Sequence, residues 1–296
     1  SLANFDMKII PIAGTLLIYN LKITAWFQRA VASVLKIELI LINLLHMRKV
    51  LEDNYSYLVV DDATKEEPTK VLEISNAEGV TIKHLLTTHH HPDHSGGNTE
   101  FVKQKPGIKV YGGDDRIPEI TEKLTHEQEF KIGNNINVRT LHTPCHTTGS
   151  ISYYLTDISD DNQKAVFTGD TLFIGGCGRF FEGTGQDMHT SLNQILGSLP
   201  PETKVYCGHE YTESNLQFAL SVDPNNQALK NKISWVESGG FGSIKDRPVV
   251  TVPSTIGGEK DFNPFMRVDS DAIKKAVQEE DPVETISKLR ELKNNF

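Results

Sequence analysis

The chain has 296 residues, of which 38% are hydrophobic and 23% are charged, so it is long and apolar enough to bury a full core. Its net charge of −9 disfavours binding to nucleic acid or other polyanions. Three cysteines are too few for a disulfide framework, and no charge-free apolar run reaches the ~18 residues that a membrane span needs. We therefore expect no transmembrane span.

The first 47 residues differ from the rest because they are both apolar and basic. No acidic residue occurs from residue 7 to residue 37, whereas four basic residues do. Such a segment is typical of a mitochondrial transit peptide. The alternative hypothesis is that residues 7–12 form a first strand, that residues 50–60 continue it, and that residues 13–49 are an insertion.

The remaining chain divides into an α/β part and a helical part. Periodicity predicts strands at residues 54–62, 81–87, 109–112, 130–141 (a hairpin), 150–155 and 165–168, and helices at 98–105 and 186–199. A polar loop is expected over residues 156–164. Strand signals nearly vanish later, where helices are expected at 215–222, 226–236, 270–278 and 282–292. The pattern predicts an α/β domain over residues 48–212 and a helical domain over residues 213–296.

Residues 87–98, with the sequence TTHHHPDHSGGN, concentrate metal-binding side chains directly after an expected strand. His89 and His91 project to the same side of an extended segment and can bind one ion. Beyond the turn that Pro92 opens, Asp93 and His94 can face a second ion. A His-rich surface loop is the alternative, but an aspartate and paired glycines have no place in a simple histidine tract.

This stretch resembles the HxHxDH signature of the metallo-β-lactamase superfamily, which implies an αββα sandwich with a binuclear metal site at one edge. The resemblance requires a histidine, an aspartate and a histidine further along, and each candidate follows or ends an apolar run. By resemblance, the first ion is bound by His89, His91 and His146, the second by Asp93, His94 and His209, and both by Asp170.

A narrower resemblance covers residues 54–296. The strings YGGDDR, TPCHT, FTGDTLFIGGCGRFFEG, VYCGHEYT, NPFMRV and LRELKNNF are similar to those of the glyoxalase II (hydroxyacylglutathione hydrolase) family. The resemblance implies hydrolysis of S-D-lactoylglutathione to glutathione and D-lactate, a step of methylglyoxal detoxification, with Asp93 and Asp170 as catalytic residues. Hydroxide shared by two divalent ions would attack the thioester. Zinc is expected, with iron or manganese as alternatives at the second position.

The resemblance also implies the substrate contacts, which are Arg179, Phe181, Tyr211, Arg290 and Lys293. Arg290 and Lys293 are three residues apart, so they share one helix face and can together bind a carboxylate. The alternative is that both are solvated charges at a helix end. Arg179 stands where many family members have lysine, and Phe181 stands where tyrosine is common. The expected partner is a small glutathione thioester, and the protein is expected to be a cytoplasmic monomer, with mitochondria as the alternative location.

One departure from the family pattern lies between residues 62 and 79, where about seven residues and an internal strand are missing. Either residues 71–74 take the place of this strand, or the chain is an inactive splice or gene-model variant. A further alternative is a metallo-β-lactamase-fold enzyme that acts on another thiol or on a persulfide.

Overall fold

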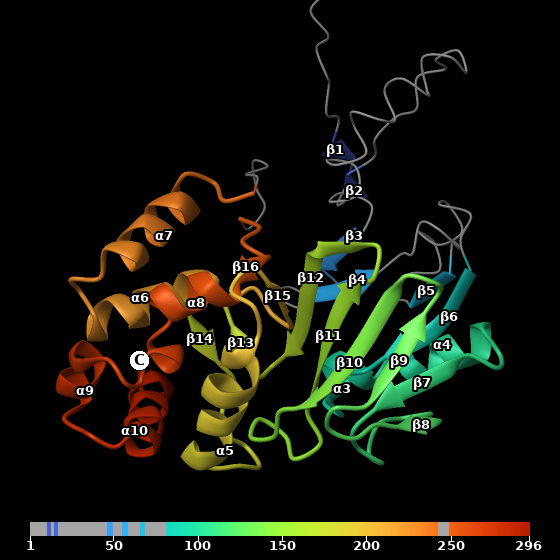
Figure 1. Ribbon diagram of the computed structural model, residues 1–296, viewed down its shortest axis with the longest axis horizontal. Helices are drawn as coiled ribbons and strands as arrows, with labels where there is room; N and C mark the ends of the chain where they lie inside the picture. The colour runs from blue at the N-terminus through green and yellow to red at the C-terminus, as the bar shows by residue number, and fades with distance from the viewer. Residues whose placement is uncertain are drawn as a thin grey trace, which may run out of the picture.

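A computed structural model describes residues 81–241 and 249–296 continuously. Before residue 81 it describes only five short strands, β1 (Pro11–Ile12), β2 (Thr15–Leu16), β3 (His46–Lys49), β4 (Tyr55–Leu58) and β5 (Glu66–Pro68). Figure 1 shows two sheets beside a group of helices that lies towards the C-terminus.

The larger sheet has six strands in the order β16-β15-β12-β11-β10-β9. Its strands are β9 (Glu129–Ile132), β10 (Ile136–His142), β11 (Ile151–Asp157), β12 (Asp160–Gly169), β15 (Lys204–Cys207) and β16 (Ser254–Thr255). The smaller sheet has the order β5-β6-β7-β8, with β6 (Thr81–Leu86), β7 (Lys109–Gly112) and β8 (Glu122–Lys123) all parallel. Strands β13 (Leu172–Phe173) and β14 (Gly176–Cys177) form a separate hairpin.

Alternating side chains of the six-stranded sheet fill two different cores. Tyr153 and Phe167 belong to the core that also contains Tyr111 of β7, so this face packs on the smaller sheet. Tyr154 and Val166, one residue later or earlier, belong to the core on the opposite face. Because successive side chains of a strand point to opposite faces, the six-stranded sheet contributes side chains to a core on each of its two faces.

A helical layer covers the outer face of each sheet. Helix α4 (Asn98–Gln104) packs through Phe101 and Val102 against Leu85 and Val110 of the smaller sheet. Helix α5 (Gly185–His189) continues as a π-helical turn (Thr190–Ile195) and a 3-10 turn (Leu196–Ser198), which pack on the six-stranded sheet. The αββα sandwich is confirmed.

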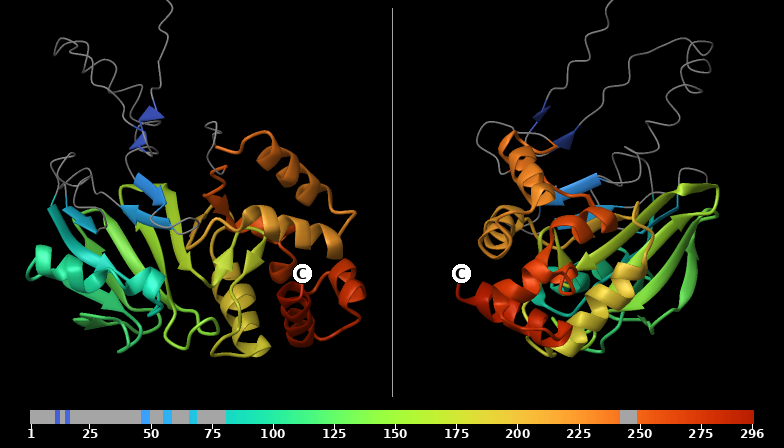
Figure 2. Two further views of the ribbon diagram at one scale, coloured as in Figure 1. Left: turned by 180° about the vertical axis from the view of Figure 1, so that it is seen from behind. Right: turned by 60° about the vertical axis from the view of Figure 1, so that its left-hand side comes forward.

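The helices after residue 211, orange and red in the two views of Figure 2, gather against one side of the sandwich. They are α6 (Thr212–Val222), α7 (Gln227–Glu237), α8 (Ile256–Phe262), a 3-10 turn (Pro264–Met266), α9 (Asp271–Val277) and α10 (Pro282–Asn294). Ile286 and Leu289 of α10 share a core with Leu141 and Val205 of the sheet. The predicted helical C-terminal region is therefore confirmed, and it is packed on the sandwich.

The predicted polar loop over residues 156–164 is wrong. Strand β11 runs to Asp157 and β12 starts at Asp160, so the hairpin turns tightly within that segment. The first residues of β12 are mostly exposed or half-buried, and they carry no apolar alternation for the sequence to reveal. Polar strand ends of this kind pair through backbone hydrogen bonds that are independent of side-chain type.

Most of the atypical N-terminal segment lies outside the described residues. Of residues 7–12, only Pro11–Ile12 is described as a strand, and it pairs with Thr15–Leu16. Strand β4 pairs with His46–Lys49, which the insertion hypothesis had assigned to the insert. The place beside β6 is taken by β5 (Glu66–Pro68), whereas residues 71–74, expected there, lie outside the described residues.

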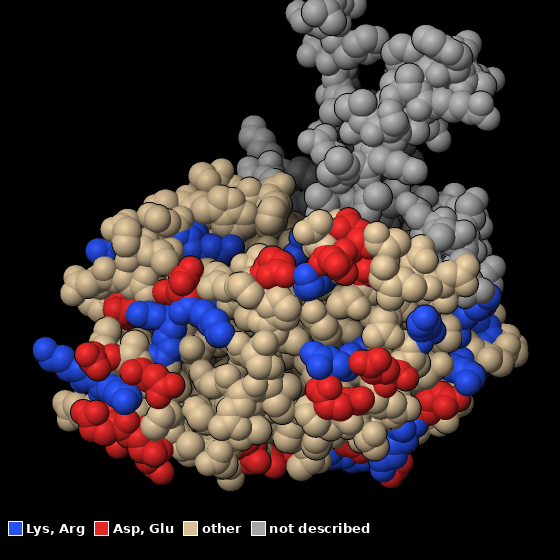
Figure 3. Space-filling model, viewed as in Figure 1, with Lys and Arg blue, Asp and Glu red and all other residues tan. Residues whose placement is uncertain are grey.

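Figure 3 shows basic and acidic side chains interspersed over the face that it draws, with no continuous basic surface there. This distribution agrees with the net charge of −9. No helix among residues 81–241 and 249–296 is long and apolar enough to cross a membrane.

Glu259 on α8 is a buried carboxyl group that links the helical region to the hairpin β13–β14. Its Oε2 accepts hydrogen bonds of 2.9 Å from the backbone N–H of Gly175 and from the side-chain amide of Asn263. Burial raises the pKa of Glu259 to about 7. Because the folded-state pKa lies above the unfolded value, the stabilising contribution of Glu259 is complete below about pH 4 and is lost as the pH rises towards 7.

We therefore expect Glu259→Gln to gain stability relative to the wild type as the pH rises. Between pH 5 and pH 8 the difference in the free energy of unfolding should change by about 2 kcal/mol in favour of the variant. Urea unfolding at both pH values measures it, with the exposed Glu237→Gln as a control. A difference that does not depend on pH would contradict the assignment.

Candidate metal centre

Four loops meet at one edge of the sandwich, and each follows the carboxyl end of a strand. The loop after β6 carries His89, His91, Asp93 and His94, and the loops after β10, β12 and β15 carry His146, Asp170 and His209. Pro92 starts a four-residue helix, α3 (Pro92–Ser95), so Asp93 and His94 leave the extended direction of His89 and His91. The ligands predicted from sequence therefore converge from distant parts of the chain.

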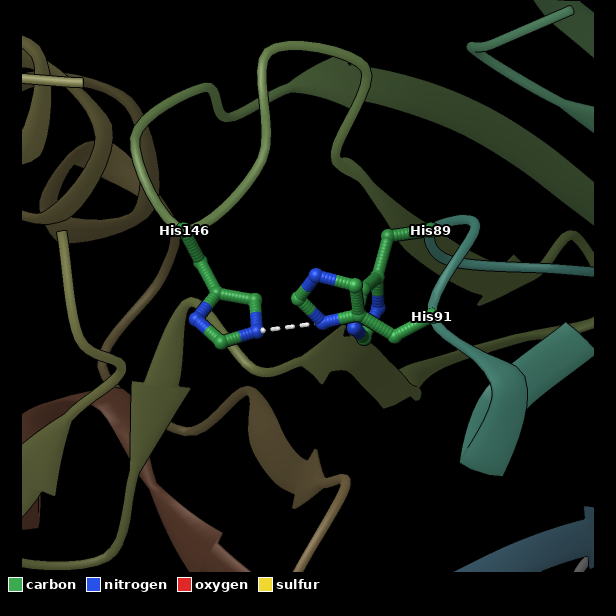
Figure 4. A group of neighbouring side chains, drawn as sticks. All are labelled: His89, His91 and His146. Carbon is green, nitrogen blue, oxygen red and sulfur yellow. Dashed lines mark hydrogen bonds between the residues drawn. The ribbon is translucent and has the colours of Figure 1, made fainter. Parts of the chain in front are cut away.

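His89, His91 and His146 form the first group, and their ligand atoms all lie within 4.8 Å of one another. Figure 4 shows the three imidazoles turned towards a common point. The Nε2 of His146 lies 3.1 Å from the Nδ1 of His91. This is the predicted nitrogen-rich position.

Asp93, His94 and His209 form the second group within the same limit. The Nε2 atoms of His94 and His209 are 3.1 Å apart, and each lies 3.3 Å from Oδ2 of Asp93. Asp170 lies between the groups, because its carboxylate is 3.4 Å from Nε2 of His146 and 3.2 and 3.3 Å from those of His94 and His209. The geometry therefore provides two neighbouring positions with one carboxylate in common.

The protein atoms fit a pair of metal ions. Among the described residues, none donates to or accepts from the buried Nε2 of His89. A Cβ atom at Gly208 would lie 2.3 Å from Oδ1 of Asp170 and 2.8 Å from the His94 ring, so only glycine leaves this space open. Imidazoles with carboxylates are a donor set for zinc, iron or manganese. The arrangement is a binuclear metal site.

The pKa values of three of the histidines agree with this assignment. Burial lowers the pKa of His89, His91 and His146, which favours the neutral imidazole that a metal requires. Burial alone would also lower the pKa of His94, but Asp170 and Asp93 raise it to about 9. The hydrogen bond from His94 lowers the pKa of Asp93 to about 2. Two ionised carboxylates in a largely buried site call for positive charge there.

Three of the predicted substrate contacts surround the centre. Tyr211 stacks on the ring of His209, with centroids 4.7 Å apart, and Phe181 lies 5.2 Å from the ring of His146. Both side chains are exposed, as is Arg179. Since these side chains are accessible beside the ligands, a bound substrate can contact them, and their substrate role stays a prediction.

Arg290 and Lys293 lie on α10 and differ in their surroundings. Arg290 is 7% exposed and donates to the carbonyl of Cys177 at 2.8 Å, so its guanidinium helps to hold the chain near the centre. Lys293 donates to the carbonyl of Ser214 at 2.9 Å and is partly exposed. Burial and the neighbouring Arg290 lower the pKa of Lys293 to about 8. Of the two, Lys293 is better placed to bind an anion from solvent.

Some functional contacts were not expected from the sequence. The carbonyl oxygen of Arg179 lies 3.0 Å from Nδ1 of His146, and Oγ1 of Thr88 lies 3.1 Å from Nδ1 of His89. Such contacts orient metal-binding imidazoles. A carbonyl oxygen has no sequence signal, because every residue has one.

The three cysteines are buried and do not offer a reactive thiolate. Burial raises the pKa of Cys145 and Cys207, and it raises that of Cys177 to about 11. A thiolate nucleophile needs a lowered pKa. These side chains contribute to the cores instead.

Two consecutive parts of the chain match known protein families, and both matches agree with this geometry. Residues 56–209 match the metallo-β-lactamase superfamily, and residues 210–296 match the hydroxyacylglutathione hydrolase C-terminus. A hydroxyacylglutathione hydrolase-like protein from Gallus gallus is 45% identical over 83% of this chain and 88% of its own length. The chain belongs to the hydroxyacylglutathione hydrolase family. Another relative, the cytoplasmic hydroxyacylglutathione hydrolase of Arabidopsis thaliana, is 43% identical over 83% of this chain and 96% of its own.

Solved structures of proteins with other names share the fold. ETHE1 from Myxococcus xanthus is 25% identical, with a TM-score of 0.56 over 83% of this chain and 89% of that one. A metallo-β-lactamase from Staphylococcus aureus is 26% identical, with a TM-score of 0.55 over 83% of this chain and 66% of that one. Because proteins with different names share this architecture, the substrate must be argued from the site and the family.

Proposed function

We propose that the chain hydrolyses S-D-lactoylglutathione to glutathione and D-lactate, as a thioester hydrolase of methylglyoxal detoxification. The observation that carries this function is the convergence of seven predicted metal ligands beside a helical region that matches the hydroxyacylglutathione hydrolase C-terminus. The identity of 43% to a relative named hydroxyacylglutathione hydrolase, and of 45% to one named hydroxyacylglutathione hydrolase-like protein, supports it.

The residues that would hold two ions are those of the two groups with Asp170 between them. When bound, a pair of divalent ions supplies Lewis-acid activation of water and of an acyl carbonyl near neutral pH. We expect zinc at the nitrogen-rich first position, with zinc, iron or manganese at the second, where Asp93 adds a carboxylate.

The protein's own side chains orient the reactants. Asp93 is partly exposed and, with a pKa of about 2, stays ionised at neutral pH, so it can accept a hydrogen bond from the attacking water. Arg179 and Lys293 supply positive charge for the anionic glutathione, and Tyr211 supplies a phenolic hydroxyl. A glutathione thiolate leaves without a strong acid because thiols have a pKa of about 8.5.

We expect Lys293→Ala to raise KM for the glutathione thioester about tenfold, with little change in kcat, because it removes a charge that binds the peptide and not the reacting carbonyl. Steady-state kinetics measures both constants. Lys288→Ala is the matched control, since Lys288 lies on the same helix and pairs with Glu291. Equal KM values in the two variants would mean that Lys293 is a solvated charge.

The alternative activity is the processing of another thiol or a persulfide. Two assays on one purified sample separate the two functions: release of glutathione from S-D-lactoylglutathione, and consumption of oxygen with glutathione persulfide. Release of glutathione without oxygen consumption is expected. The opposite result would assign the chain to the alternative, and the absence of both activities, with no bound metal, would indicate an inactive variant.

The remaining assignments complete the proposal. We place a metallo-β-lactamase domain at residues 48–212 and a glutathione-binding helical domain at residues 213–296, after an atypical segment over residues 1–47. A cytoplasmic monomer is expected, and the name of the Arabidopsis thaliana relative supports this location. Mitochondria remain the alternative that the basic N-terminal segment favours.

A further inference from the structure

Beside the metal ligands, one guanidinium lies between two carboxylates that the reaction does not use. Arg116 donates from Nε to both oxygens of Asp114, at 3.0 and 2.9 Å, and from Nη2 to Oδ2 of Asp114 at 2.5 Å. Its Nη1 and Nη2 donate to the two oxygens of Glu182, at 2.5 and 2.8 Å. Each carboxylate is therefore bound by two nitrogens, an arrangement that fixes geometry more strictly than a single contact.

Glu182 connects this guanidinium to the loop of a metal ligand. Its Oε2 accepts from the backbone N–H of Thr148 at 2.7 Å and from the Thr148 hydroxyl at 3.0 Å. The backbone N–H of Glu182 donates to the carbonyl of Cys145 at 3.1 Å. Cys145 and Thr148 flank His146, so the loop that carries this ligand is held on both sides.

The same two carboxylates face the first ligand loop. The ring of His90, which lies between His89 and His91 in the chain, is 3.6 Å from Asp114 and 3.9 Å from Glu182. Gly149 also packs closely here, since a Cβ atom on it would lie 2.5 Å from the Cβ of Asp114. Three loops therefore meet at Asp114 and Glu182, the two carboxylates that Arg116 binds.

Residues 179–182 lie beside the metal centre, and the side chain of Glu182 links them to Arg116. The Arg179 carbonyl lies 3.0 Å from Nδ1 of His146, and the Phe181 ring lies 5.2 Å from the ring of His146 and 5.9 Å from that of His91. Phe181 is 61% exposed, so burial does little to hold it there. Within residues 179–182, Glu182 is the residue whose side chain forms an ion pair with another part of the protein.

We propose that Arg116 is a positioning residue that, through Glu182, holds residues 179–182 against His91 and His146. In doing so, it sets the metal affinity of the first group and the rate of thioester hydrolysis. Isolated ion pairs at the surface contribute little to stability, whereas networks of charges with two-point contacts can contribute more. The side chains of Asp114 and Glu182 are only 11% and 25% exposed, which limits screening by solvent.

The test compares Arg116→Ala, Arg116→Lys and Glu182→Gln with the control Arg139→Ala. Arg139 also pairs with a carboxylate, that of Glu127 at 3.1 Å, and is similarly accessible. Arg116→Ala should weaken zinc binding about tenfold or more in a competition with a chromogenic chelator, and should lower kcat by a similar factor. The zinc affinity and kcat of Arg116→Lys should lie between those of the wild type and of Arg116→Ala, because lysine keeps the charge but not the two-point geometry. The control should change either quantity less than about twofold.

Two further readouts separate positioning from a general loss of stability. The visible absorption spectrum of the cobalt-substituted protein should change in Arg116→Ala and not in Arg139→Ala, whereas their melting temperatures should be similar. Unchanged zinc affinity, or a lower melting temperature as the sole effect, would overturn the proposal. If the alanine variant does not fold, Arg116→Lys decides by the same readouts. The expected change in kcat rests on the proposed function, whereas the expected change in zinc affinity does not. Wild-type protein that binds zinc without hydrolysing the thioester would therefore count against the proposed function alone.

Discussion

Asp170→Asn is expected to lower kcat for thioester hydrolysis about 10³-fold, equivalent to about 4 kcal/mol, and to reduce the bound metal below two ions per chain. The carboxylate is buried and lies within 3.4 Å of imidazole nitrogens from both ligand groups. Asparagine keeps the size of the side chain but removes the charge that both ions need. Steady-state kinetics and metal analysis on the same preparation measure the two effects.

The control for this substitution is Asp160→Asn, which changes a partly exposed carboxylate at the start of β12. Its Oδ1 accepts from the backbone of Asn162, so only a local turn is affected. Wild-type kinetics are expected for it. An Asp170→Asn variant that kept two ions and more than about a tenth of the wild-type rate would exclude a bridging role.

Phe265→Ala is expected to lower the free energy of unfolding by about 3–5 kcal/mol, the range measured for deletion of a buried phenylalanine ring. Phe265 is fully buried, stacks on Phe218 of α6 and lies beneath the guanidinium of Arg290 on α10. Its core also includes Leu141 and Val205 of the six-stranded sheet. Loss of the ring therefore loosens the contact between the helical region and the sandwich.

Urea unfolding followed by circular dichroism measures this loss, with Phe241→Ala as the control because its ring is 62% exposed. The control should change the free energy of unfolding by less than about 1 kcal/mol. If both substitutions had equal small effects, the helical region would not be packed on the sandwich as the structure has it.

The clustering of the predicted ligands could be expected from the sequence, because the first four are closely spaced and the superfamily pattern supplies the other three. Four ligands lie within six residues, and the other three come at the ends of apolar runs whose strands are confirmed. Each loop that carries a ligand follows the carboxyl end of its strand, and these ends meet at one edge of the sandwich. The division into a first and a second group came from the resemblance to the metallo-β-lactamase superfamily, and the structure brings the same side chains together.

The rest of the site was not predictable, because it depends on contacts between side chains that are distant in sequence. Arg116 and Glu182 are separated by 66 positions, and neither differs in type from an ordinary surface charge. The helical pattern of the sequence also does not predict that Arg290 is buried against the carbonyl of Cys177. In the fold, the ends of β11 and β12 were missed because polar strand ends lack the apolar period on which the prediction relied.

The most direct test of the binuclear site is to add zinc in steps to the metal-free full-length protein and to follow hydrolysis of S-D-lactoylglutathione at each step. The two adjacent ligand groups that share Asp170 predict that activity rises until two ions are bound per chain and then stays constant. Full activity with one ion per chain, or no activity with two, would contradict the account.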